Sequence, residues 1–175
     1  MRYDFRNDAI LGPAFAYWEA KCGGRAMPRR ADIDPSEITR LLPYLQITEF
    51  VDGGARIRYR LVGTAIVTAY GAELTGKYFD EVFAGDRLRV VIDNYRVMCR
   101  EKRPIFIGSR YVSRKDTELF CYRLLMPLSN DGTTINQVIT AMSFKYPNEA
   151  SQIAGQGFGN DVDFDRGAGF REVIR

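Results

Sequence analysis

An alternating stretch in the first half of the chain sets the strongest limit on its fold. Within residues 55–65 three arginines alternate with three apolar residues, in the order Arg56, Ile57, Arg58, Tyr59, Arg60 and Leu61. A period of two is typical of a β-strand that has one face in water and one face on a core. Charged side chains also discourage pairing with other chains, so we predict that this strand lies at or near a sheet edge. Gly63 ends the pattern and predicts a sharp turn into helices that cross the apolar face.

The remaining elements follow from periodicity and turn residues. Apolar spacings of three and four predict helices over residues 8–22, 34–42, 64–71, 75–83 and 86–103. Alternating or continuous apolar runs predict strands over residues 44–51, 55–62, 104–114, 117–128 and 135–146. Two strands, a helical segment and three strands predict an α+β architecture, with a five-stranded antiparallel sheet and helices on one face. Residues 147–175 are rich in Gly and acids, which predicts a flexible C-terminal tail.

Four separated motifs resemble one family. They are MPRRADIDPSEITRLLPYL, RYRLVGTA, GAELTGK and YRLLMPLSNDG. Together with the order of elements over residues 15–146, they resemble PAS domains of the stand-alone type abundant in alphaproteobacteria. The resemblance implies a PAS-like domain over residues 43–146, preceded by an N-terminal helical extension over residues 1–42 that lies outside the core. It also implies that the chain senses a small ligand or cofactor, dimerises, or docks a signalling partner.

Composition excludes several classes of protein. The net charge of +3 is small and Arg is interleaved with acids, so the basic block typical of nucleic-acid binding is missing. No apolar run reaches the ~20 residues that span a bilayer, and the N-terminus does not resemble a signal peptide. We therefore expect a cytoplasmic protein.

The chain contains no histidine. This absence excludes haem bound through histidine, a Ser-His-Asp or Cys-His catalytic centre, and zinc sites that use imidazole. The thiols of Cys22, Cys99 and Cys121 are far apart and form no C-x-x-C pair, so we predict free thiols and no metal site. The Asn-Cys motif of flavin-binding PAS proteins is also missing, which argues against a flavin cofactor, although a small ligand of unknown identity stays open.

Two interpretations of the interior follow from the resemblance. The residues expected to line it are Tyr59, Leu61, Val67, Tyr70, Phe79, Tyr95, Phe120, Tyr122, Leu124 and Met126. Several are tyrosines, whose hydroxyl groups need a partner when buried. The set therefore describes either a ligand cavity with polar groups or a filled core.

Interface candidates come from two faces of the sheet. The last predicted strand, VITAMSF, is apolar on both faces, and the helix carrying Phe15 and Trp18 is expected to cover it from the same chain or from a second copy. This apolar cover favours a homodimer. The arginine face formed by Arg56, Arg58 and Arg60 is either a solvated edge or a docking site for an acidic partner.

We therefore expect a sensory or signalling module without catalytic residues. The alternative is a ligand-free scaffold for signalling proteins. A third hypothesis is a small enzyme that uses the carboxylates of Glu73, Asp80 and Glu81, although acids on exposed helix faces give the same pattern.

Overall fold

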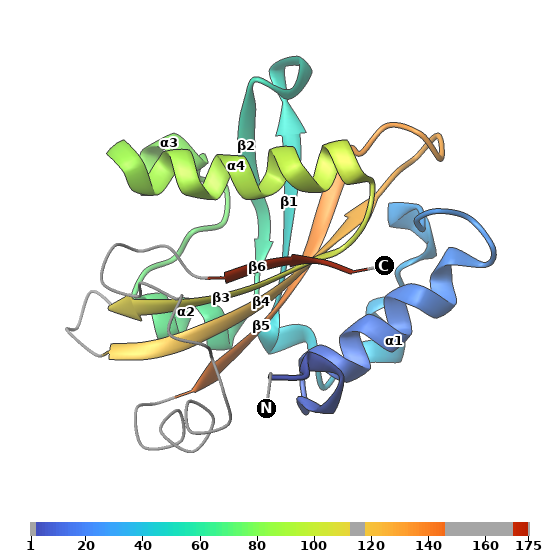
Figure 1. Ribbon diagram of the computed structural model, residues 1–175, viewed down its shortest axis with the longest axis horizontal. Coiled ribbons are helices and arrows are strands. Elements are labelled where there is room, and N and C mark those ends of the chain that lie inside the picture. Colours follow the sequence, from blue (N-terminus) through green and yellow to red (C-terminus); the bar gives the residue numbers. More distant parts are fainter. Residues whose placement is uncertain (1–2, 113–117, 146–169, 175) are drawn as a thin grey trace.

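The computed structural model describes residues 3–112, 118–145 and 170–174 (Figure 1). The strands are β1 (Leu45–Val51), β2 (Arg56–Val62), β3 (Ile105–Val112), β4 (Glu118–Leu128), β5 (Gln137–Lys145) and β6 (Phe170–Val173). The α-helices are α1 (Leu11–Cys22), α2 (Thr64–Tyr70), α3 (Phe79–Val82) and α4 (Gly85–Glu101).

The strands form one antiparallel sheet in the order β2-β1-β5-β4-β3-β6. The predicted α+β class and the edge position of β2 are confirmed. The prediction of five strands is wrong by one, because residues 170–173 of the predicted tail form β6 and pair with β3. The tail residues before them lie outside the described part of the chain.

The sheet is the middle layer of the domain, with a hydrophobic cluster on each face. Residues of α2, α3 and α4 pack on one face, and those of α1 and the N-terminal turns pack on the other. Successive residues of β4 divide between the faces, since Cys121 belongs to the α4 side and Tyr122 to the α1 side. Figure 1 shows α4 and α1 lying well apart. The additional N-terminal helix that was predicted is therefore present, and it packs in the hydrophobic cluster on the face of the sheet opposite α4.

Strand β2 contains an irregularity that changes the direction of one predicted interior residue. Ile47 of β1 is opposite Leu61, whereas the next residue, Thr48, is opposite Tyr59, so Arg60 is an extra residue on β2. An extra residue of this kind reverses the faces of the residues that follow it. Tyr59 is therefore 3% exposed and Leu61 is 42% exposed. The prediction that Leu61 faces the interior is wrong.

The glycine that ends the alternation is required by a close approach of two backbones. A Cβ atom on Gly63 would lie 2.3 Å from the carbonyl oxygen of Pro43 and 2.4 Å from that of Leu42. The amide of Gly63 donates to the carbonyl of Leu45 at 2.8 Å, and α2 begins at the next residue. The chain thus leaves the sheet at this point against the backbone that enters β1.

The N-terminal helix covers the sheet of its own chain. Before α1, the carboxylate of Asp8 accepts hydrogen bonds from the amides of Ile10 and Leu11 at 2.8 and 2.9 Å. Phe15 and Trp18, both on α1, are 8% and 5% exposed within this cluster. The sequence left open whether this helix comes from the same chain or from a second copy, and in the structure the helix of the same chain covers the sheet.

Two predicted helices differ from the structure. Residues 34–42 do not form one helix, and 3₁₀ turns lie at Pro35–Ile38 and Leu42–Tyr44 instead. The helix expected over 75–83 is reduced to α3. None of the helices in the described residues has the length and apolar composition needed to cross a membrane.

Candidate functional site

The interior between α4 and the sheet is an aromatic cluster. Four of the residues predicted to line it are placed there and are at most 7% exposed: Tyr59, Tyr70, Phe79 and Tyr95. The ring of Phe79 lies between those of Tyr59 and Tyr95, with centroid separations of 4.8 and 5.2 Å. Burial raises the pKa of the Tyr59 and Tyr95 phenols, so both are neutral at ordinary pH.

Few polar groups enter this cluster. The hydroxyl groups of Tyr95 and Thr48 share a hydrogen bond of 3.1 Å. The guanidinium of Arg123 donates from Nη2 to Ser109 Oγ at 2.8 Å. The cavity that remains has a volume of only about 20 Å³. A space of this size holds one water-sized group.

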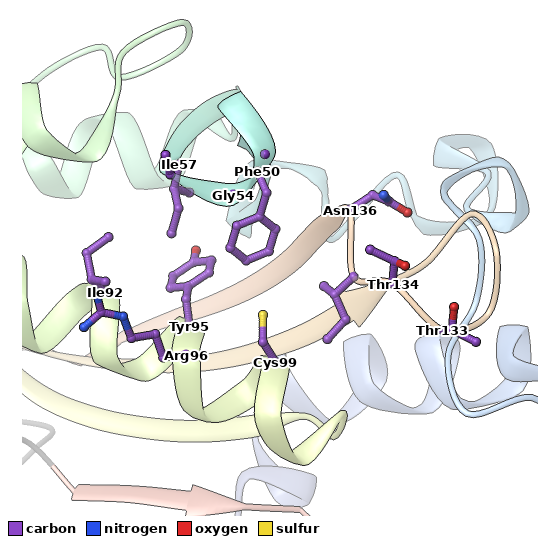
Figure 2. Close-up of a pocket in the computed structure, with 13 residues that line it drawn as sticks. Phe50, Gly54, Ile57, Ile92, Tyr95, Arg96, Cys99, Thr133, Thr134 and Asn136 are labelled. Carbon is purple, nitrogen blue, oxygen red and sulfur yellow. The ribbon is translucent and has the colours of Figure 1, made fainter.

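A much larger groove of about 570 Å³ opens beside this interior. Its walls come from α4, from the turn between β1 and β2, and from the loop between β4 and β5. Figure 2 shows Tyr95 and Cys99 on α4 pointing toward the side of Phe50, with Arg96 beside Ile92 and Thr134 on the loop side. The residues that line the groove are Phe50, Gly53, Gly54, Ala55, Ile57, Ile92, Tyr95, Arg96, Cys99, Thr133, Thr134, Ile135 and Asn136.

Hydrogen bonds fix the loop side of the groove. The carboxylate of Asp131 accepts from the amides of Thr133 and Thr134 at 2.8 and 2.6 Å and from Ser129 Oγ at 2.9 Å. These hydrogen bonds hold the pKa of Asp131 well below its usual range. The carbonyl of Asn136 also accepts from the amide of Phe50 at 3.1 Å. The loop and β1 are therefore joined before any ligand binds.

Of the groove residues, only Tyr95 was predicted from the sequence as a site residue. In an antiparallel pair, the turn that follows one strand lies beside the loop that precedes the other strand. Here Glu49 near the end of β1 is opposite Gln137 at the start of β5, which brings both turns to one end of the sheet. Predicting the groove from the sequence would have required knowing that β1 and β5 are neighbours in the sheet.

Four predicted interior residues lie on the other face of the sheet. Phe120, Tyr122, Leu124 and Met126 pack in the cluster under α1. The prediction that they line the interior is wrong, because both faces of β4 are buried and apolar alternation does not identify the face. Cys121, Arg123 and Leu125 point into the interior in their place. Val67 is half-buried and lies outside the main interior cluster.

The three arginines of β2 have acidic partners within the chain. Arg56 donates from Nε to Asp80 at 2.8 Å, and Arg58 and Arg60 both pair with the carboxylate of Glu49. These ion pairs account for the arginine face at this edge.

The three carboxylates proposed for an enzyme do not converge on a cleft. All are exposed, and each makes a local hydrogen bond. Glu73 accepts from the amide of Thr75, Asp80 pairs with Arg56, and Glu81 accepts from the amide of Tyr78. The Thr75 amide lowers the pKa of Glu73, and Arg56 lowers that of Asp80. Neither carboxyl therefore has the raised pKa expected of a general acid.

The thiols and acids give no further chemical site. Cys22, Cys99 and Cys121 are free thiols. Burial raises the pKa of all three, that of Cys121 to about 11, which is the opposite of a nucleophilic thiolate. In the described ranges no three Cys, Asp or Glu side chains gather in a way that could hold a metal ion.

Comparisons with known proteins agree with this architecture. A family model described as a PAS domain matches residues 9–143. A search of curated proteins finds no significant match. Among solved structures, a light-oxygen-voltage domain concerned with a flavin analogue has a TM-score of 0.52 at 6% identity, covering 69% of this chain and 90% of that chain. The dark structure of the blue-light photoreceptor Aureochrome1 LOV has a TM-score of 0.50 at 10% identity, covering 71% of this chain and 91% of that chain. At these identities the similarity concerns the fold alone.

Proposed function

The chain belongs to the PAS domain family, and we propose that this sensory-type signalling module acts by binding a small organic molecule in the groove beside α4. The observation that supports this most is the volume of the groove, about 570 Å³. Pockets for small molecules generally have ~300–1,000 Å³ and combine apolar walls with a few polar groups.

The groove lining suggests the class of molecule. Phe50, Ile57 and Ile92 offer apolar surface to a flat or aliphatic body. Arg96 adds a guanidinium and Thr134 adds a hydroxyl group. We expect a ligand with an apolar body and an anionic or polar substituent.

A ligand in the groove touches both α4 and the two turns, so its binding is sensitive to their relative position. On the same helix, Asp93 pairs with Arg171 of β6 at 2.7 Å, and Asn94 accepts from the same guanidinium at 3.2 Å. A small movement of α4 thus reaches the strand nearest the C-terminus. In this proposal β6 and α4 carry the signal to a partner protein, and the domain itself catalyses nothing.

A ligand-free scaffold is the second candidate. It is favoured by the interior itself, since aromatic side chains fill it down to about 20 Å³. The same filling is the reason that we do not propose a flavin for this chain. A homodimer remains a prediction. It was first suggested by an apolar face of the sheet that needed a cover, and α1 of the same chain covers that face. The third hypothesis, a carboxylate enzyme, is not pursued, since its acids form local contacts.

Native mass spectrometry of freshly purified protein tests the proposal. The groove predicts a bound species that is present in the native mass and missing from the denatured mass. Native and denatured masses that agree, in protein purified without dialysis, would favour the scaffold.

A further inference from the structure

The interior contains one cation, Arg123, for which the described residues provide no counter-ion. It lies on the α4 side of β4, opposite Ile107 of β3 and Met142 of β5. Its Nη2 donates to Ser109 Oγ, which is neutral, and no described carboxylate is within ion-pair distance of the guanidinium. A guanidinium in such a place needs an anion or water to replace its lost hydration.

Two unpartnered polar atoms face the same small cavity. Among the described residues, the buried side-chain atoms that lack a hydrogen-bond partner of good geometry include Arg123 Nε and Thr140 Oγ1, and the Thr140 hydroxyl also lies near that of Tyr95 and lowers its pKa. Both residues line the cavity of about 20 Å³. The strand register explains their proximity, because Thr140 is opposite Leu125, two positions from Arg123 on the same face. Residues in this diagonal relationship are close enough to share a small ligand.

The rest of the cavity wall supplies no negative charge. Its other polar residues are the amides Gln46 and Asn94 and the phenols Tyr59, Tyr70 and Tyr95. Burial raises the pKa of Tyr59 and Tyr95, so neither phenol offers an oxyanion at ordinary pH. An anion at this place would therefore meet a cation and neutral donors, with no carboxylate to repel it.

We propose that this cavity is a binding site for a small monoanion, held by the Nε–H of Arg123 and the hydroxyl of Thr140. Both groups donate, and the volume fits one atom or group of about the size of a water molecule. A halide or one oxygen of a small carboxylate such as formate meets these conditions. The site is separate from the groove lining except for Tyr95.

Bromide and formate are the probes that test the site. In crystals grown with sodium bromide, we expect an anomalous peak within hydrogen-bonding distance of Arg123 Nε and Thr140 Oγ1. In solution, we expect the melting temperature to rise and saturate with sodium bromide or sodium formate, compared with sodium gluconate at equal ionic strength. Saturation with bromide alone would identify a monatomic site, and saturation with both would identify a site that also accepts carboxylates.

Variants separate this site from a general salt effect. Arg123→Met should abolish the saturable shift, and Thr140→Val, which keeps the side-chain volume, should weaken the apparent affinity about tenfold. Arg89→Met is the matched control, because Arg89 is on the exposed face of α4 in an exposed pair with Asp86. Its response should equal that of the wild type.

Two results would overturn the anion site. One is the lack of an anomalous peak at Arg123 at saturating bromide. The other is a saturable halide response that is the same as in the wild type in both Thr140→Val and Arg123→Met, of which Thr140→Val is expected to fold. Neither result bears on the groove, whose ligand is detected by mass and whose lining excludes Arg123 and Thr140.

Discussion

The indole N–H of Trp18 donates to the backbone carbonyl of Pro127 at 2.9 Å, across 109 residues of sequence. This hydrogen bond joins α1 to β4 within the cluster on the outer face of the sheet. It shows that the N-terminal helix is part of the folded domain, since a buried donor and a buried acceptor both depend on it.

Trp18→Phe tests this junction. The change removes the donor, leaves the Pro127 carbonyl unpaired and deletes buried volume, so we expect the free energy of unfolding to fall by about 2–4 kcal/mol. Urea denaturation measures it, with Val90→Ala on the exposed face of α4 as the control. An unchanged urea midpoint combined with a smaller sedimentation coefficient would place Trp18 in an interface between copies.

Asp8 predicts a dependence of stability on acid. Its carboxylate accepts from Tyr3 at 2.5 Å and Ser143 at 2.8 Å as well as from the first amides of α1. Burial raises the pKa of Asp8, but these hydrogen bonds outweigh it and hold the pKa below the ordinary 3.8. Because the pKa is lower in the folded state, Asp8 contributes its stability above pH ~4 and loses it as pH falls through the folded pKa.

Asp8→Asn isolates this contribution. We expect the variant to be about 1–3 kcal/mol less stable at pH 7. Its difference from the wild type should shrink as the pH falls below about 4, and chemical denaturation at each pH measures it. A difference that stays constant over this range would contradict the assignment of the acid-sensitive step to Asp8.

Gly108 is expected to control the docking of β6. A Cβ atom at this position would lie 2.3 Å from Cε1 of Phe170, whose ring packs against Phe106 with centroids 5.1 Å apart. Gly108→Ala should therefore displace the ring, lower stability by about 1–3 kcal/mol, and speed amide hydrogen exchange at Arg171 and Ile174.

A double-mutant cycle gives the control for this prediction. In Phe170→Ala the ring is gone, so adding Gly108→Ala should cost less than it does alone. Strictly additive effects would mean that the ring does not occupy the space above Gly108.

If the groove is the binding site, a bulky substitution on the groove side of α4 should weaken ligand binding, whereas the same substitution on the exposed side should not. Ile92→Trp fills the groove and should weaken binding of the aromatic sulfonate 8-anilinonaphthalene-1-sulfonate about tenfold or more, a change of ~1.4 kcal/mol. Val90→Trp places the same side chain at an exposed position of the same helix and should leave binding unchanged. Fluorescence titration compares them, and equal affinities would show that the dye binds elsewhere.

Local patterns predicted much of the fold. The arginine alternation placed β2 at an edge, and the spacing of Leu88, Val91, Ile92 and Tyr95 predicted α4, which packs on the interior cluster. These predictions succeeded because one side of each element differs in polarity from the other. The helix of Phe15 and Trp18 and the apolar strand that it covers were also predicted, but the sequence left open whether the cover comes from the same chain or from a second copy.

Only the tertiary structure decided which way the central strands face and what gathers at their ends. Both faces of β4 are buried, so a period of two fits either orientation. Tyr122, expected in the interior, lies on the α1 side, and Arg123 lines the interior cavity. The extra residue in β2 turned Leu61 to solvent through its pairing with β1. The groove and the cavity at Arg123 and Thr140 combine residues far apart in sequence, and such sites exist only once strand order and register are set.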